Sequence, residues 1–292
     1  MRTVKGFMGK THVLLSVMLF CLCMLIPVDF FQETIGIMKN EALFFIVGIV
    51  VLAGGALLPD LDNAQSSAGA TLGPVGSICT TFMQTISSIL WNLLHGKGDK
   101  PPQTQHRYFW HTLVAGASIF CLFFFGMPKG EQTLVSSYKE TKEITTWLQN
   151  NVAVLVLFIF VFVAILVGSD KVFSFFIKKF SLPKILSYIL PTACVVYTVF
   201  LNFTHLRILG LCIGMGYAFH CIEDCFADSG VPLFWPIPIG RQMWHRIRFI
   251  PVTIKTGGLT NTILDIVILI IDIILIVVIF TTKSIGVVPP NL

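Results

Sequence analysis

The amino-acid sequence predicts an all-α, polytopic membrane protein with about seven transmembrane helices and one further helix that is interfacial or re-entrant. Composition is the first observation behind this prediction, because 55% of the 292 residues are hydrophobic and only 12% are charged. A soluble domain carries about 25% charged residues. The second is a series of apolar windows, and the third is an excess of Lys and Arg in alternate loops. No long polar block interrupts the windows, so residues 1–292 are expected to form a single membrane-embedded domain.

The expected spans follow the apolar windows, each close to the roughly 17–25 residues that a transmembrane helix needs. They cover residues 11–28, 41–59, 110–127, 150–168, 184–203, 206–223 and 262–281. The sixth window is short, and its end is polar. Together the windows predict a multi-pass protein.

Residues 77–94 predict a different kind of helix. Polar residues lie mostly on one side of it, and apolar residues recur at helical spacing on the other: Ile78, Phe82, Ile86, Ile89, Leu90 and Leu93. This pattern favours a helix that lies in the membrane interface. Because its polar face lacks the basic residues of a typical surface anchor, a re-entrant segment or a lid is the alternative.

Basic residues indicate the orientation. The loops that we expect in the cytoplasm hold Arg2, Lys5, Lys10, Lys97, Lys100, Arg107, Lys171, Lys178, Lys179, Lys184, Arg241, Arg246, Arg248 and Lys255. The positive-inside rule then places the N-terminus in the cytoplasm and the C-terminus outside. The net charge of +5 is too small and too scattered to indicate a nucleic-acid partner. The eight cysteines lie mostly in apolar runs, as small hydrophobic residues rather than a disulfide framework.

Four groups of ligand-type residues lie at the predicted cytoplasmic ends of helices. They are His12; Asp60 and Asp62; His106, Arg107 and His111; and His220 and Asp224. The orientation was derived from Lys and Arg, so the shared location of the His and Asp residues is a separate observation. It predicts that the four groups meet at one membrane face.

The residue types and spacings favour a metal site. His220 and Asp224 are four residues apart and share a helical face. Imidazole nitrogen with carboxylate oxygen suits Zn²⁺, with Mn²⁺ or Fe as alternatives, better than Ca²⁺. Asp60 and Asp62 follow a proline, so we expect an extended turn from which both side chains reach one cavity. Arg107 offers a guanidinium fork suited to a phosphate.

Each group taken alone has a simpler explanation. A single His or Asp at a helix end is ordinarily interfacial, and Asp60 and Asp62 could be capping or solvated residues. Taken together at one face, the groups favour a function. A charged side chain near the hydrocarbon core costs roughly 2.5–3.5 kcal/mol, and a bound cation would offset that cost.

Several other polar residues are expected to have only local roles. They are His95, His205 and His245 in loops, and Cys221, Glu223, Cys225 and Asp228 beside the His220–Asp224 pair. Asp272 lies in the middle of the last span, seven residues after Asp265 and therefore on the same side of the helix. An acid at that depth is a functional or pairing candidate, although no basic partner is visible.

The blocks that carry these residues resemble the YdjM-like family, LexA-regulated inner-membrane proteins of bacteria that are classed as metal-dependent hydrolases. The blocks are THVLLSV around His12, LLPDLDNAQS at 57–66, HRYFWHTL at 106–113 and GYAFHCIEDCFADSGVPLFWPI at 216–237. By this resemblance, residues 130–205 form an extended middle region. The chain departs from the family pattern at Tyr108, Trp110, Thr112, Asp228, Ser229 and Asn261, and Glu223 is not a family position.

The resemblance implies a membrane-bound, metal-dependent hydrolase of the bacterial inner membrane. We expect one or two divalent ions, held by His12, Asp60, His111, His220 and Asp224. Asp62 or His106 then acts as general base or orients the ligands, and Arg107 holds an anionic group. The depth of the site favours a phosphoester or lipid-linked substrate, reached past residues 77–94.

Two other classes of function suit the same residues. A transporter of metal ions or small anions would place its site near the bilayer midplane and often shows internal repeats, whereas here the polar residues gather at one face. A non-catalytic scaffold would use a structural metal with a closed coordination shell, whereas a catalytic metal keeps one position open.

Overall fold

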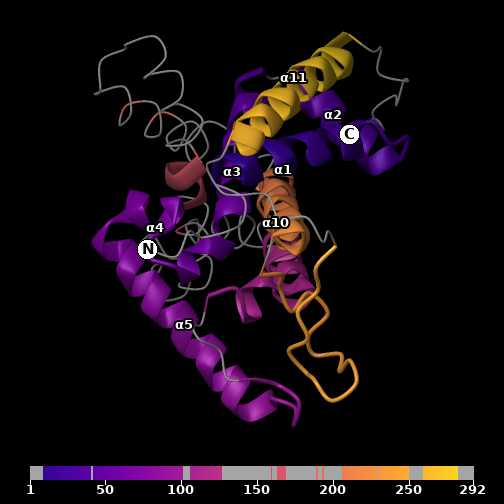
Figure 1. Cartoon of the computed structure of the whole chain (residues 1–292). Coiled ribbons are helices and arrows are strands. Elements are labelled where there is room, and N and C mark those ends of the chain that lie inside the picture. The colour runs from indigo at the N-terminus through magenta and orange to yellow at the C-terminus, as the bar shows by residue number, and fades with distance from the viewer. Residues whose placement is uncertain are drawn as a thin grey trace, which may run out of the picture.

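In the computed structural model of the protein, the regular secondary structure of the described residues is all helical (Figure 1). Those residues are 9–40, 42–100, 106–126, 159, 163–168, 189, 193, 206–227, 229–249 and 259–281. Within these ranges there is no β-strand, only the isolated bridges Val231–Ile247 and Ile239–Gln242. The predicted all-α class is confirmed for this part of the chain.

Three of the described helices are long and apolar enough to cross a membrane. They cover Phe44–Asp62, Arg207–Phe226 and Leu259–Thr281. A shorter apolar helix covers Leu113–Gly126, where the third span was predicted. The predicted spans 150–168 and 184–203 fall largely outside the described residues.

The first predicted span, 11–28, is not one straight helix. α1 (Gly9–Met24) ends early, and α2 (Asp29–Asn40) leaves it at 116°. Pro27 lies in the break, where its ring and its missing N–H end a helix. The two helices together make a fourth candidate span, bent in the middle.

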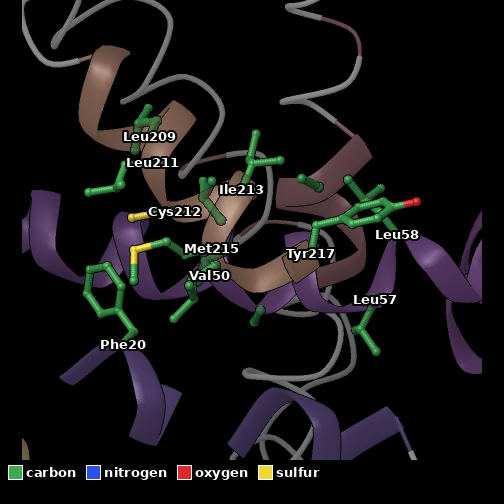
Figure 2. Close-up of a cluster of buried hydrophobic side chains, with 14 of the residues drawn as sticks. Phe20, Val50, Leu57, Leu58, Leu209, Leu211, Cys212, Ile213, Met215 and Tyr217 are labelled. Atoms are coloured by element: carbon green, nitrogen blue, oxygen red, sulfur yellow. The ribbon is translucent and has the colours of Figure 1, made fainter. Parts of the chain in front are cut away.

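α3 (Ala42–Leu57) and α10 (Leu206–Glu223) form the centre of the bundle. The candidate spans that contain them are each 83% buried inside the protein, against 22% for α11 (Leu259–Thr281). Figure 2 shows buried apolar side chains around this contact, among them Val50 and Leu57 of α3, Cys212, Ile213 and Met215 of α10, and Phe20 of α1. α11 is therefore peripheral, with most of its apolar side chains pointing outward.

Glycines allow the backbones of α3 and α10 to approach closely. A Cβ atom at Gly55 would lie 2.5 Å from the carbonyl oxygen of Ile213, and one at Gly216 would lie 2.3 Å from that of Leu52. Both distances are far inside van der Waals contact, so only glycine fits at either position. Small residues at close crossings are typical of membrane helix pairs. This approach fixes the end of α3 relative to the end of α10.

α4 (Ser67–Leu72) and α5 (Pro74–Leu94) follow, and α5 reaches away from the bundle (Figure 1). α5 begins three residues before the predicted start at 77, because Pro74 supplies the fixed φ that suits the first turn of a helix. The inner side of α5 bonds the turn after α3: Thr80 Oγ1 donates to the carbonyl of Leu61 at 2.7 Å, and Gln84 Nε2 donates to that of Asp62 at 2.8 Å.

The outer side of α5 carries an apolar stripe. Five large side chains on it are between 51% and 72% exposed: Val75, Ile78, Phe82, Ile89 and Leu93. The buried side of the same helix is instead mostly small or polar, with Gly76, Thr80 and Ser87 beside a single large apolar residue, Met83. This arrangement is the reverse of a surface helix of a soluble protein.

Residues 229–249 cover the end of the bundle at which α10 stops. The backbone N–H of Leu113 donates to the carbonyl of Leu233 at 2.9 Å. The carboxylate of Asp99 accepts from the backbone N–H groups of Met243 and Trp244, at 3.0 and 3.1 Å. Trp244 also stacks on Trp235 with ring centroids 4.8 Å apart. Hydrogen bonds and aromatic contacts thus hold this irregular segment in place.

α11 contacts α1 through its few polar side chains. Thr11 Oγ1 donates to Asp265 at 2.7 Å, Lys10 Nζ lies 2.5 Å from the same carboxylate, and Asn261 Nδ2 donates to Thr11 at 3.1 Å. Asp272 is also buried, which confirms that it shares a side of the helix with Asp265. No described residue hydrogen-bonds the carboxyl group of Asp272.

Gly55→Ala is expected to lower the free energy of unfolding by about 1–3 kcal/mol, because the added methyl group forces α3 and α10 apart. Denaturation in detergent micelles, followed by circular dichroism, measures this loss. Gly36→Ala in α2 is the matched control, since a Cβ atom there meets nothing within 4 Å. An equal loss in both variants would contradict the close contact.

Candidate metal centre

All four predicted groups of ligand-type residues meet at one end of the bundle. They come from the first turn of α1, the turn after α3, the segment before the helix Leu113–Gly126, and the end of α10. The contacts that follow join His12, Asp60, Asp62, His106, Arg107, His111, His220 and Asp224 into one network. The four groups therefore converge at one end of the bundle, as their positions along the chain predicted.

Short 3₁₀ helices carry much of this end. η1 (Pro59–Asp62) follows α3, η2 (Phe109–His111) precedes the next helix, and η5 (Asp224–Phe226) follows α10. Pro59 has no N–H to continue the α-helical pattern, and the N–H of Leu61 bonds the carbonyl of Leu58 at 3.1 Å. Asp60 and Asp62 thus lie on a tight helical turn, and the predicted extended turn is wrong.

The first candidate metal group consists of His12, His220 and Asp224. One donor atom from each lies within 4.8 Å of the others, and all three residues are buried. The rings of His12 and His220 stack with centroids 4.1 Å apart. Asp224 lies beside both, with Oδ2 3.4 Å from Nε2 of His220 and Oδ1 3.7 Å from Nε2 of His12.

The second candidate group consists of Asp60, His106 and His111, again with donor atoms within 4.8 Å. This group is less enclosed, because the side chains of Asp60 and His106 are 14% and 24% exposed. Two contacts join it to the first group. Asp60 Oδ1 lies 3.7 Å from Nε2 of His220, and His111 Nδ1 lies 2.7 Å from Oδ2 of Asp224.

Asp62 contacts both histidines of the second group. Its Oδ1 lies 2.5 Å from Nδ1 of His106, and its Oδ2 accepts the backbone N–H of Arg107 at 3.0 Å. The same Oδ2 is 3.4 Å from Nε2 of His111. With its side chain fully buried and both oxygens in use, Asp62 is placed to fix the two imidazole rings.

Arg107 contacts two of the other three segments, through Asp62 and Asp224, and also contacts Ser229. Its backbone φ is +61°, a left-handed conformation that residues other than glycine seldom adopt. The guanidinium places one nitrogen 3.0 Å from Oδ1 of Asp224 and donates with another to Ser229 Oγ at 2.9 Å. The fork that the sequence suggested for a phosphate is therefore engaged with the carboxylate and a hydroxyl group.

Glu223 was expected to be a bystander, and the structure corrects this. It is buried, its Oε2 lies 2.8 Å from Nδ1 of His12, and its Oε1 accepts from Ser16 Oγ at 3.2 Å. The available signal was composition, since a glutamate in a buried apolar helix is rare unless it is paired. Its partner is 211 residues away in the sequence.

The other minor polar residues stay outside the two groups. His95 stacks on Trp91, and His245 lies 2.8 Å from Gln242. Cys221 and Cys225 are buried, and neither belongs to a candidate metal group among the described residues. His205 and Asp228 lie outside the part of the chain that the structure describes.

The centre has an excess of acid groups and of donor atoms without hydrogen bonds. Both ring nitrogens of His111 and His220 and both carboxylate oxygens of Asp224 have no hydrogen-bond partner within the described residues. Asp224 instead makes ion-pair contacts, with its Oδ1 3.0 Å from Arg107 and its Oδ2 2.7 Å from Nδ1 of His111.

Comparison with known proteins identifies one family. The family model described as YdjM inner membrane protein matches residues 7–174 and 185–286, which is most of the chain. No curated protein and no solved structure matches significantly.

Arg107→Met is expected to lower the free energy of unfolding of the chelator-treated protein by about 3–5 kcal/mol, because it leaves the buried Asp224 carboxylate without its cation. Met keeps most of the apolar stem and the same backbone strain. Ser229→Ala, which removes only the second contact of the guanidinium, should cost about 1 kcal/mol or less. Denaturation in micelles tests both, and an equal effect would contradict a dominant Arg107–Asp224 pair.

Proposed function

This chain belongs to the YdjM inner membrane protein family, and from that premise we propose that it is a membrane-bound, metal-dependent hydrolase. The proposed substrate is a phosphoester or lipid-linked compound at the cytoplasmic face of the bacterial inner membrane. The observation that carries the proposal is the convergence of imidazole nitrogens and carboxylate oxygens from four distant segments into two groups with metal-ligand spacing, in which the buried rings of His111 and His220 have no hydrogen bond within the described residues.

A divalent cation would account for this set. Leaving a buried polar atom without a hydrogen bond costs about 1–3 kcal/mol, and the imidazole rings of His111 and His220 have such atoms. The carboxylates of Asp60, Asp62 and Asp224 lie in this network with the guanidinium of Arg107, which pairs with Asp224. Bound cations would supply positive charge and would be coordinated by the imidazole nitrogens and carboxylate oxygens.

The two groups define which residues would hold the ions. His12, His220 and Asp224 would hold one, and Asp60, His106 and His111 would hold a second. Mixed imidazole and carboxylate donors suit Zn²⁺ first, with Mn²⁺ and Fe as alternatives. The first group alone makes a one-ion centre, so the proposal covers one ion or two.

The remaining residues have roles that follow from their contacts. When bound, the metal lowers the pKa of a water ligand and polarises the scissile group. When only the first group holds an ion, His106 is free to act as general base: it is the most exposed of the four imidazoles, and its Nδ1 lies 2.5 Å from Asp62. Arg107 can exchange its Ser229 contact for an anionic oxygen of the substrate.

The proposed membrane arrangement has seven spans with the N-terminus in the cytoplasm. The apolar stripe on α5 supports a lipid-facing position for this helix, because its exposed side is apolar and its protein-facing side is not. The inner side of α5 bonds η1, which carries Asp60 and Asp62. A lipid-linked substrate would therefore approach the centre alongside α5.

A transporter remains the second candidate for one reason, the buried Asp272 in the middle of α11. The two metal groups themselves lie at helix ends rather than at broken helices near the midplane. Uptake of ions into proteoliposomes, abolished by Asp272→Asn but not by changes in the metal groups, would favour transport over hydrolysis.

His220→Ala and Asp224→Ala are each expected to remove the bound metal and to reduce hydrolysis at least 100-fold, since both residues belong to the buried group. Elemental analysis of purified protein measures the metal, and release of phosphate from phospholipid and other phosphoester substrates measures the reaction. His245→Ala, outside the centre, is the control. Unchanged metal content and unchanged activity in both alanine variants would refute the proposal.

Phe82→Lys on the exposed stripe is expected to reduce hydrolysis of a long-chain lipid substrate about tenfold, because a charge there opposes contact with hydrocarbon. Hydrolysis of a water-soluble short-chain analogue should be unchanged. Thr85→Lys places the same charge at an exposed polar position of the same helix and serves as the control. Equal effects on both substrates would contradict a lipid-facing role for α5.

A further inference from the structure

We propose that Glu223 is a positioning residue of the metal centre, which orients His12 and holds it in the form that binds a metal. This inference rests on the proposed function, because it assigns Glu223 a part in metal binding. The residue does not belong to either candidate metal group itself. Its effect would reach the ion only through His12.

The contact geometry is that of a carboxylate behind a ligating histidine. Oε2 of Glu223 lies 2.8 Å from Nδ1 of His12, and the opposite ring nitrogen, Nε2, faces Asp224 at 3.7 Å. The same ring stacks on His220 at 4.1 Å. The His12 ring thus has Glu223 at one nitrogen, Asp224 near the other nitrogen, and His220 stacked on its face.

This arrangement gives Glu223 a way to set which nitrogen of His12 carries the proton. An ionised carboxylate only accepts hydrogen bonds, so in that state the proton of the neutral ring would lie on Nδ1. The lone pair would then lie on Nε2, the nitrogen nearer to Asp224. An ionised Glu223 behind the ring would also raise the basicity of that lone pair, as outer carboxylates do in other metal sites.

A third residue holds the carboxylate in place. Ser16 lies one helical turn after His12 on α1, and its Oγ donates to Oε1 of Glu223 at 3.2 Å. Each oxygen of Glu223 therefore has a separate partner on α1. His12, Ser16 and Glu223 are at most 3% exposed, so water does not compete for these bonds.

A purely structural role would use the same contacts, since they also tie α1 to α10. The two roles differ in what they predict. A structural tie changes stability, whereas a positioning residue changes the affinity and the ligand field of the ion even when the fold is intact. Asp265 offers a matched comparison, because it is another buried acid that bonds α1, in its case through Thr11 and Lys10.

The experiment compares purified wild-type protein with Glu223→Ala, Glu223→Gln, Ser16→Ala and Asp265→Asn. Zn²⁺ affinity is measured by competition with a chromophoric chelator, and Co²⁺ replaces the metal to record its visible absorption spectrum. Glu223→Ala should weaken Zn²⁺ binding 10–100-fold and alter the Co²⁺ spectrum. Glu223→Gln should lie between, because its amide oxygen still accepts the Nδ1 proton but carries no charge. Ser16→Ala should have a smaller effect, and Asp265→Asn should match wild type.

The outcomes separate this inference from the proposed function. Wild-type protein that binds no metal, or a His220→Ala variant that binds it normally, would refute the metal centre as a whole. If wild type binds metal and His220→Ala does not, but both Glu223 variants keep wild-type affinity and spectrum, only the positioning role is refuted. Glu223→Ala and Asp265→Asn with equal losses of affinity would also refute it, since the effect would then be a general one on α1. Circular dichroism confirms that each variant is folded.

Discussion

The carboxylate of Asp224 is the point on which the functional end of the molecule depends. It stands beside the guanidinium of Arg107 at 3.0 Å and beside the imidazoles of His111, His220 and His12 at 2.7, 3.4 and 3.7 Å. These partners come from three separate segments of the chain. A charge that is wholly buried is tolerated only with partners of opposite sign or a bound cation. The surrounding helices are therefore constrained to end where those partners can reach it.

The sequence predicted the end of α10 in this centre well, because both the helix and the spacing of its ligand residues depend only on neighbouring residues in the chain. The helix 206–223 was predicted at its observed bounds, and the spacing of His220 and Asp224 follows from one helical turn. The bend between α1 and α2 was missed, since an apolar window shows that a segment is apolar and not how it turns. The tight turn that carries Asp60 and Asp62 was also missed, because a proline excludes an α-helical hydrogen bond but does not select its replacement.

The contact between Glu223 and His12 could not be predicted from spacing. Periodicity relates residues a few positions apart, whereas this pair is separated by 211 positions and meets only after α1 packs on α10. The inverted polarity of α5 has a similar origin. Its alternation of apolar and polar residues was visible in the sequence, but which side faces the protein depends on the carbonyl groups of η1.

The glycine contact between α3 and α10 has a consequence for how such a protein can change over generations. Gly55 and Gly216 leave no space for even one methyl group, so a substitution there moves whole helices and with them the two halves of the centre. α11, at the periphery, can exchange one apolar side chain for another at little cost. We therefore expect substitutions to be tolerated mainly on peripheral helices such as α11. The contact between α3 and α10 can change only by several simultaneous replacements.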